Sequence, residues 1–138
     1  MPNRLFTLAE ARDLIQQVAP LIERFVTKQR RIQELETVME AIRRSAASNG
    51  GSAHADTKEQ ARETSHLNAE LQHILDELNE IGVELKDPLR GLLDFPALRQ
   101  GRRVYLCWQS GETTIDWWHE IRDGFPGRQP IIDEEWPA

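Results

Sequence analysis

Two apolar heptad stripes, separated by a segment without periodicity, constrain the fold of this chain more than any other feature. Both stripes alternate spacings of three and four residues, which is typical of helices that pack along a shared seam. The intervening residues 45–55 contain Asn49-Gly50-Gly51 and predict a flexible turn. The sequence therefore predicts a long antiparallel, coiled-coil-like helical hairpin over residues 1–82. The stripes comprise Ala11, Leu14, Val18, Leu21, Phe25, Ile32, Leu35, Met39 and Ile42, interrupted by Lys28, and then Thr64, Leu67, Leu71, Ile74, Leu78 and Ile81.

The first helix carries its own start signal. Thr7 and Glu10 have the spacing of a capping box, in which each side chain bonds a free backbone amide at the helix start. Pro20 removes one hydrogen bond inside the helix, so we expect a bend there without a stop. Ile15 and Ile22 widen the stripe, which predicts that the N-terminal half of the helix packs against more than one neighbour.

The second helix is expected to start at Asp56 or Thr57 and to end at Gly82. A hairpin this long has little core of its own, so its apolar flanks need a cover. We expect two hairpins to pack into a four-helix homodimer. The alternative is that the C-terminal part of the chain covers these flanks.

The period changes from helical to alternating after Gly82, and seven of the nine aromatic residues follow Asp94. Residues 83–138 are therefore expected to form a small antiparallel, tryptophan-rich β-sheet, which makes the fold α+β. We expect strands over residues 83–86, 92–95 and 103–109, with Pro96 closing the second. Ser110-Gly111 is predicted to be a hairpin turn into a further strand.

A two-residue turn at Ser110-Gly111 fixes the register of that hairpin. It pairs Val104 with Trp117, Leu106 with Ile115 and Trp108 with Thr113. This register makes one face apolar, with His119 at its edge. The opposite face is too aromatic for ordinary solvated surface, so we expect it to be covered. That face holds Tyr105, Cys107, Thr114, Asp116 and Trp118.

Composition restricts the partners and the compartment. The formal net charge is −6 and the pI is about 5.2, which disfavours nucleic acid and anionic lipid surfaces as partners. Cys107 is the single cysteine, and the N-terminus lacks the pattern of a secretory signal. No apolar run approaches the roughly 20 residues that cross a bilayer. We therefore expect a cytoplasmic protein without a membrane span.

Six stretches of the chain have a familiar combination of residues: Phe6 to Ala11, Val83 to Pro96, Val104 to Trp108, Gly111-Glu112, Trp118-His119 and Gly124 to Arg128. Together they resemble the bacterial family of domains of unknown function numbered 2203. The resemblance spans almost the whole chain and is most specific in the sheet region. It implies a small bacterial protein with a helical first part, and it implies no known activity.

The candidate site is a group of titratable residues interleaved with tryptophans in the sheet region. Such a group can bind a small anionic ligand with an arginine against an aromatic wall, or a divalent metal through carboxylates and imidazole. The group comprises Asp94, Cys107, Glu112, Asp116, His119, Glu120 and Arg128. From it we select Asp94, Trp108, Glu112, Trp118, His119 and Arg128 as ligand-binding residues, and His119, Glu112 and Glu120 as possible metal ligands.

Each candidate residue also has a purely structural interpretation. His119 can be a hydrogen-bonded core histidine. Cys107 can be a nucleophile with His119 as its base, but a lone cysteine inside an apolar strand is typical of a small buried hydrophobe. Arg128 can bind a ligand, or can form a salt bridge to Asp94 or Glu112.

The second helix holds two consecutive Glu-x-x-His units. This spacing occurs in di-iron four-helix proteins, where the units lie on different helices and point into the core. Both units here lie on one helix beside the apolar seam, which favours a solvated face with i, i+4 pairing. The residues are Glu63, His66, Glu70, His73 and Glu77.

Phosphate-binding loops, dinucleotide fingerprints, serine elbows and zinc motifs are absent from the sequence. We therefore expect a non-enzymatic module that dimerises or binds a small ligand. The alternative is a metal-dependent, hydrolase-like enzyme that uses His119 and nearby carboxylates.

Overall fold

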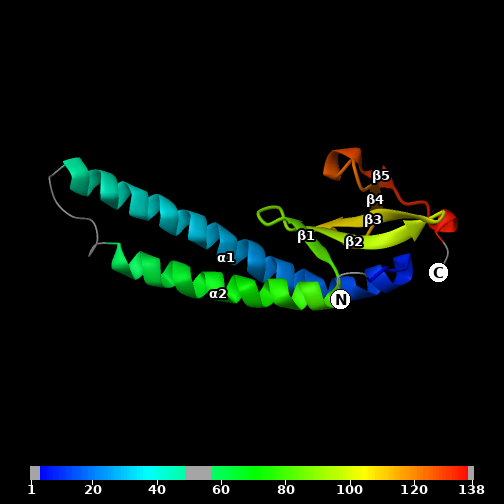
Figure 1. The fold of residues 1–138 in the computed structure, drawn as a ribbon, viewed down its shortest axis with the longest axis horizontal. Coiled ribbons are helices and arrows are strands. Elements are labelled where there is room, and N and C mark those ends of the chain that lie inside the picture. The colour runs from blue at the N-terminus through cyan, green and yellow to red at the C-terminus, as the bar shows by residue number, and fades with distance from the viewer. Residues whose placement is uncertain (1–3, 49–56, 137–138) are drawn as a thin grey trace.

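The computed structural model describes residues 4–48 and 57–136 and has an α+β architecture (Figure 1). Two helices, α1 (Leu8–Ser48) and α2 (Lys58–Ile81), form the hairpin. A five-stranded antiparallel sheet follows, in the order β1-β2-β3-β4-β5. Its strands are β1 (Glu84–Asp87), β2 (Leu92–Arg99), β3 (Arg102–Gln109), β4 (Trp117–Glu120) and β5 (Gln129–Pro130).

The expected start of α1 is confirmed. The Thr7 N–H donates to Glu10 Oε1 at 2.8 Å, and the Glu10 N–H donates to Thr7 Oγ1 at 3.1 Å, so the capping box is complete. The helix continues through Pro20 and runs to Ser48. The predicted turn therefore began too early at residue 45, because this alanine- and serine-containing stretch extends the helix by four more residues, 45–48. The rest of that predicted turn lies outside the described residues.

The ends of α2 are also as expected. Thr57 is the N-cap, whereas the alternative start at Asp56 lies outside the described residues. Gly82 has a left-handed conformation, and its N–H donates to the Leu78 carbonyl oxygen at 2.9 Å. A glycine is favoured at this position because it adopts a positive φ without steric cost.

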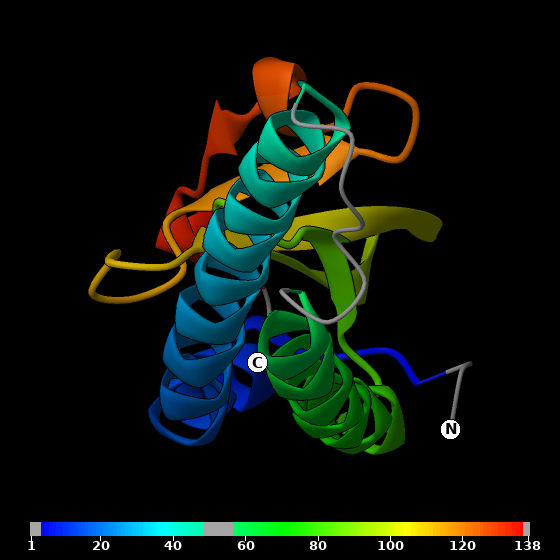
Figure 2. The same ribbon diagram turned by 90° about the vertical axis from the view of Figure 1, so that its left-hand side faces the viewer.

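The heptad seam forms the core of the hairpin, and the sheet extends that core along one half of α1. Ile15, Ile22 and Val26 belong to one hydrophobic cluster together with sheet residues such as Phe95 and Leu106. The sheet lies on one side of the hairpin, near the start of α1 and the end of α2 (Figures 1 and 2). The N-terminal half of α1 therefore packs against both α2 and the sheet, as the widened stripe predicted.

The end of the second strand was predicted wrongly. We expected Pro96 to close it, but β2 continues to Arg99. β1 pairs with β2 only as far as Asp94, so no β1 residue needs a hydrogen bond from Pro96. On that side the Phe6 N–H donates to the Pro96 carbonyl oxygen at 2.7 Å. Proline is tolerated here because the missing N–H lies where the neighbouring strand has already ended.

The predicted register between β3 and β4 is wrong by three residues. Val104 pairs with Glu120 and Leu106 pairs with Trp118, because residues 110–116 form a longer connection instead of a two-residue hairpin turn. Ile115 is fully buried, and its carbonyl oxygen accepts hydrogen bonds from the Arg12 guanidinium at 2.9 and 3.0 Å. These contacts hold the connection against α1.

A shift by an odd number of residues exchanges the two faces of a strand. Trp118 therefore belongs to the helix-facing core, where it is 5% exposed. Trp117 and His119 lie on the opposite face of the sheet, which holds Tyr105 and Cys107 as predicted.

Candidate functional site

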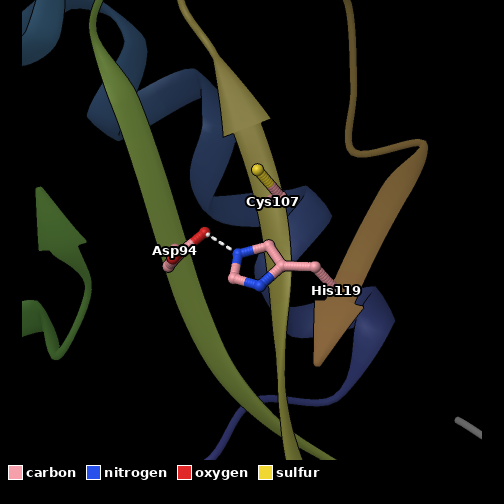
Figure 3. Close-up of side chains that lie close together, drawn as sticks. All are labelled: Asp94, Cys107 and His119. Carbon is pink, nitrogen blue, oxygen red and sulfur yellow. Dashed lines mark hydrogen bonds and ion pairs between the residues drawn. The ribbon is translucent and has the colours of Figure 1, made fainter. Parts of the chain in front are cut away.

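Asp94, Cys107 and His119 lie together on the sheet face that points away from the helices (Figure 3). They come from the neighbouring strands β2, β3 and β4, and we call them the buried cluster. Their exposed fractions are 2%, 0% and 2%. One carboxylate oxygen, the sulfur and one ring nitrogen all lie within 4.8 Å of one another. The β-register positions the cluster, since Asp94 pairs directly with Cys107.

Both ring nitrogens of His119 have acceptors. Nδ1 lies 2.7 Å from the Glu120 carbonyl oxygen, and Nε2 lies 2.9 Å from Asp94 Oδ1. Burial lowers the pKa of His119, but the hydrogen bonds with Asp94, Cys107 and the Glu120 carbonyl outweigh burial and raise it to about 10. The raised pKa of His119 therefore favours the imidazolium, whose two N–H groups donate to Asp94 and to the Glu120 carbonyl oxygen.

The raised pKa of His119 predicts a pH dependence of the free energy of unfolding. The folded state keeps the His119 proton between about pH 6.5 and 10, whereas the unfolded state loses it. The free energy of unfolding should therefore fall with rising pH in this window, by up to about 1.4 kcal/mol per pH unit. Asp94, Cys107 and Tyr105 are the titratable groups that face the ring.

Urea denaturation at a series of pH values measures this slope. A His119→Gln variant provides the control, because it lacks the titrating group and should lose the excess slope. An equal slope in both proteins would contradict the assignment.

A second polar unit adjoins the buried cluster. Arg128 donates two hydrogen bonds to the Glu112 carboxylate, at 2.7 and 2.9 Å, and its Nε–H donates to Cys107 Sγ at 3.4 Å. Its guanidinium also lies over the rings of Phe125 and Trp117. Of the alternatives that the sequence left open, the structure thus has the salt bridge from Arg128 to Glu112.

The remaining predicted site residues are dispersed. Trp108 and Trp118 belong to the helix-facing core and line no site on the opposite face. Glu120 pairs with Arg102, and Glu112 pairs with Arg128. The predicted metal set of His119, Glu112 and Glu120 is therefore not assembled, because each glutamate is already matched by an arginine. Asp116 lies 3.9 Å from Arg12, outside the buried cluster.

The arrangement does not favour nucleophilic chemistry at Cys107. A general base needs a nitrogen that can accept the thiol proton. In His119, both ring nitrogens are engaged with oxygen acceptors. Cys107 itself is fully buried, as the alternative of a small buried hydrophobe predicted.

Sequence reasoning missed a neighbouring polar group formed by Tyr105, Glu84 and Lys86. The Tyr105 hydroxyl donates to the Glu84 carboxylate at 3.0 Å, and Lys86 Nζ lies 3.0 Å from the same carboxylate. Burial and Glu84 raise the pKa of Tyr105. The Tyr105 ring lies 5.5 Å from the His119 ring. The sequence analysis placed Tyr105 on this face but not Glu84, which the same alternation could have placed there, since it also lies opposite core positions in the period-two pattern.

The Glu-x-x-His stripe of α2 faces outward and pairs with α1. Glu63 forms a two-bond ion pair with Arg31 at 2.8 and 3.1 Å, and Glu70 lies 3.3 Å from Lys28. His66 is exposed and lies 3.5 Å from Glu70. The stripe is thus a solvated helix face. Lys28 interrupts the apolar seam of α1 and forms an ion pair with Glu70 on α2.

A groove of about 850 Å³ lies at the far end of the hairpin, beyond the sheet. We call it the distal groove. Residues of α1 line most of it: four of them are charged, and Ile32 and Met39 supply apolar surface. Its lining comprises Gln29, Ile32, Glu36, Thr37, Met39, Glu40, Arg43, Arg44, Thr64 and Asn68.

Comparison with known proteins gives one match. A family model described as an uncharacterized conserved protein (DUF2203) matches residues 4–131. No curated protein and no solved structure matches the chain. Neither described helix has a stretch that is both long and apolar enough to cross a membrane.

Proposed function

We propose that this chain, which belongs to the DUF2203 family of uncharacterized conserved proteins, is a non-enzymatic interaction protein that forms a homodimer through the distal half of its hairpin. One observation carries the proposal. The hairpin extends well beyond the sheet, and a groove with self-complementary charges lies in the extended part.

The extended part of the hairpin has a thin core. α1 has 41 residues, which at about 1.5 Å per residue makes it roughly 60 Å long. Beyond the sheet, the seam residues of α1 pack against α2 among the described residues, and Val38 remains 44% exposed. Long two-helix units of this kind gain stability when a second pair completes a four-helix arrangement.

The order of charges along the groove favours a second copy of this chain as the occupant. Glu36 and Glu40 come first along α1, and Arg43 and Arg44 follow. Two copies packed antiparallel about a two-fold axis near the middle of this stretch bring the acidic end of one beside the basic end of the other. The two acidic and two basic residues balance, so the grooves of two copies are complementary in charge. Within one copy, Glu40 and Arg44 lie 3.6 Å apart as an exposed i, i+4 ion pair, which contributes little on its own and leaves both side chains accessible to a second copy.

Charge-reversal variants test this interface. Sedimentation equilibrium should show the unmodified chain at twice its 15.9 kDa mass. Glu36→Lys/Glu40→Lys and Arg43→Glu/Arg44→Glu should each weaken the dimer at least tenfold, because each variant carries one sign of charge on both sides of the axis. An equimolar mixture of the two variants should restore a dimer.

The matched control is Asp76→Lys/Glu77→Lys. This variant changes the net charge as Glu36→Lys/Glu40→Lys does, but on the part of α2 that does not line the groove. It should dimerise like the unmodified chain. A monomeric unmodified chain would refute the proposed dimer, and two variants that dimerise alone as strongly as together would refute the proposed interface.

We also propose a cytoplasmic location in a bacterial cell. The free, buried Cys107 supports the compartment, and the bacterial origin rests on the resemblance noted in the sequence. A small-ligand role for the tryptophan-rich sheet receives less support, because Glu112 already neutralises Arg128. The alternative of a hydrolase that uses His119, Glu112 and Glu120 lacks the convergence of ligands that metal-assisted hydrolysis requires.

A further inference from the structure

The buried cluster combines three different donor atoms that transition metals accept. Asp94 offers a carboxylate oxygen, Cys107 a sulfur and His119 a ring nitrogen, all within 4.8 Å of one another. Zinc binds such donors at about 2.0–2.3 Å, which places neighbouring ligand atoms roughly 3–4 Å apart. Small side-chain rotations therefore suffice to bring the three atoms to coordination distance.

The surroundings of His119 fit a metal ligand. Its Nδ1–H donates to the Glu120 carbonyl oxygen at 2.7 Å, which fixes the ring so that Nε2 points toward Asp94 (Figure 3). Histidine ligands of metals characteristically donate their second N–H to a carbonyl or carboxylate in this way. The Arg128 Nε–H, 3.4 Å from the Cys107 sulfur, is placed to support a thiolate.

The charge of the buried cluster also permits a divalent cation to replace two protons. Binding of a divalent cation releases one proton from His119 Nε2 and one from the Cys107 thiol. Two positive charges leave and two arrive, so the buried region keeps its net charge. The ion then takes over the attraction between His119 and Asp94, because it coordinates both side chains.

We infer that Asp94, Cys107 and His119 form a binding site for a divalent transition metal of the zinc class. Sulfur and imidazole donors favour zinc, cobalt or nickel over magnesium and calcium, which prefer oxygen ligands. Three protein ligands leave one coordination position for a water molecule. This site is independent of the proposed dimer, since it lies on the sheet and the distal groove lies on the hairpin.

Cobalt(II) titration of the full chain, stripped with a chelator, tests the site. We expect one equivalent to bind and to give the absorption bands of tetrahedral cobalt together with a sulfur-to-cobalt charge-transfer band. Cys107 is the single cysteine of the sequence, so this band assigns the ligand even if a cysteine variant fails to fold. Zinc should displace the cobalt and abolish the bands.

Variants locate the other two ligands. Cys107→Ser should abolish the charge-transfer band, and Asp94→Asn and His119→Gln should each raise the Kd for zinc at least tenfold, as measured by calorimetry. His66→Gln/His73→Gln is the matched control, because both histidines lie exposed on α2, and its affinity should be unchanged. Absence of a stoichiometric cobalt complex in the unmodified chain would overturn the inference, as would a loss of binding in the α2 control alone.

Discussion

Replacement of His119 by phenylalanine should lower the free energy of unfolding of the metal-free protein by about 3–5 kcal/mol. The stability falls because Asp94 remains buried, at 2% exposed, while its Oδ1 loses the hydrogen bond from His119 Nε2. An interior carboxylate that has lost its hydrogen-bonded partner is shielded from water and has no directly bonded counter-charge. Urea denaturation followed by circular dichroism measures the loss.

The double variant Asp94→Leu/His119→Phe separates this cause from a mere change of shape. With both polar groups removed, no charge is stranded, so the double variant should be more stable than His119→Phe alone. An exposed ion pair gives the comparison, since Arg31→Ala should cost only about 0–1 kcal/mol. The buried ion pair would be contradicted if the loss of unfolding free energy in the double variant equalled the sum of the losses in the two single variants.

Trp118→Ala should destabilise the protein by about 3–5 kcal/mol, whereas Trp117→Ala should cost about 1 kcal/mol or less. Trp118 lies in the helix-facing core and contacts Trp136 edge-on, with ring centroids 5.9 Å apart. Trp117 lies on the other face, is only partly buried and contacts Arg128. The two residues are adjacent and chemically identical, so each serves as the control for the other.

The same pair of variants tests the β3–β4 register. Under a two-residue turn at Ser110-Gly111, Trp117 would occupy the core and the two costs would be reversed. Chemical denaturation of both variants in parallel decides between the registers, and a larger loss for Trp117→Ala would rule out the pairing of Leu106 with Trp118.

The helices could be predicted from the sequence because their information is local. A capping box at Thr7, a left-handed glycine at Gly82 and seam residues spaced three and four apart each depend on neighbours within one or two turns. The end of α1 was less predictable, since alanine and serine residues permit helix without requiring it.

The strand register could not be predicted, because local alternation does not determine it. With tryptophan at both 117 and 118, β4 presents an aromatic side chain to each face, so either register buries one of them. The choice depends on Ile115 and its contact with Arg12, which is 103 residues away in the chain. No pattern within the strand carries that information.

The candidate site could be predicted only in part, because the sequence shows which residues carry suitable chemistry but not which of them lie close together. Asp94, Cys107 and His119 were all in the predicted group of titratable residues, and their chemistry marked them without any knowledge of geometry. The structure does not bring Glu112 and Glu120 to His119, because each pairs with an arginine, and these pairings depend on where the connection and strand ends fall.

The shared packing of α1 has a consequence during protein synthesis. Ile15 and Ile22 leave the ribosome early, while Phe95 and Leu106, which join the same hydrophobic cluster, are made more than seventy residues later. Until the sheet is synthesised, the nascent hairpin exposes the hydrophobic surface around Ile15 and Ile22, and chaperones bind exposed hydrophobic surfaces of this kind. The hydrophobic face of the N-terminal helix is therefore open to aggregation until the C-terminal third of the chain has been translated.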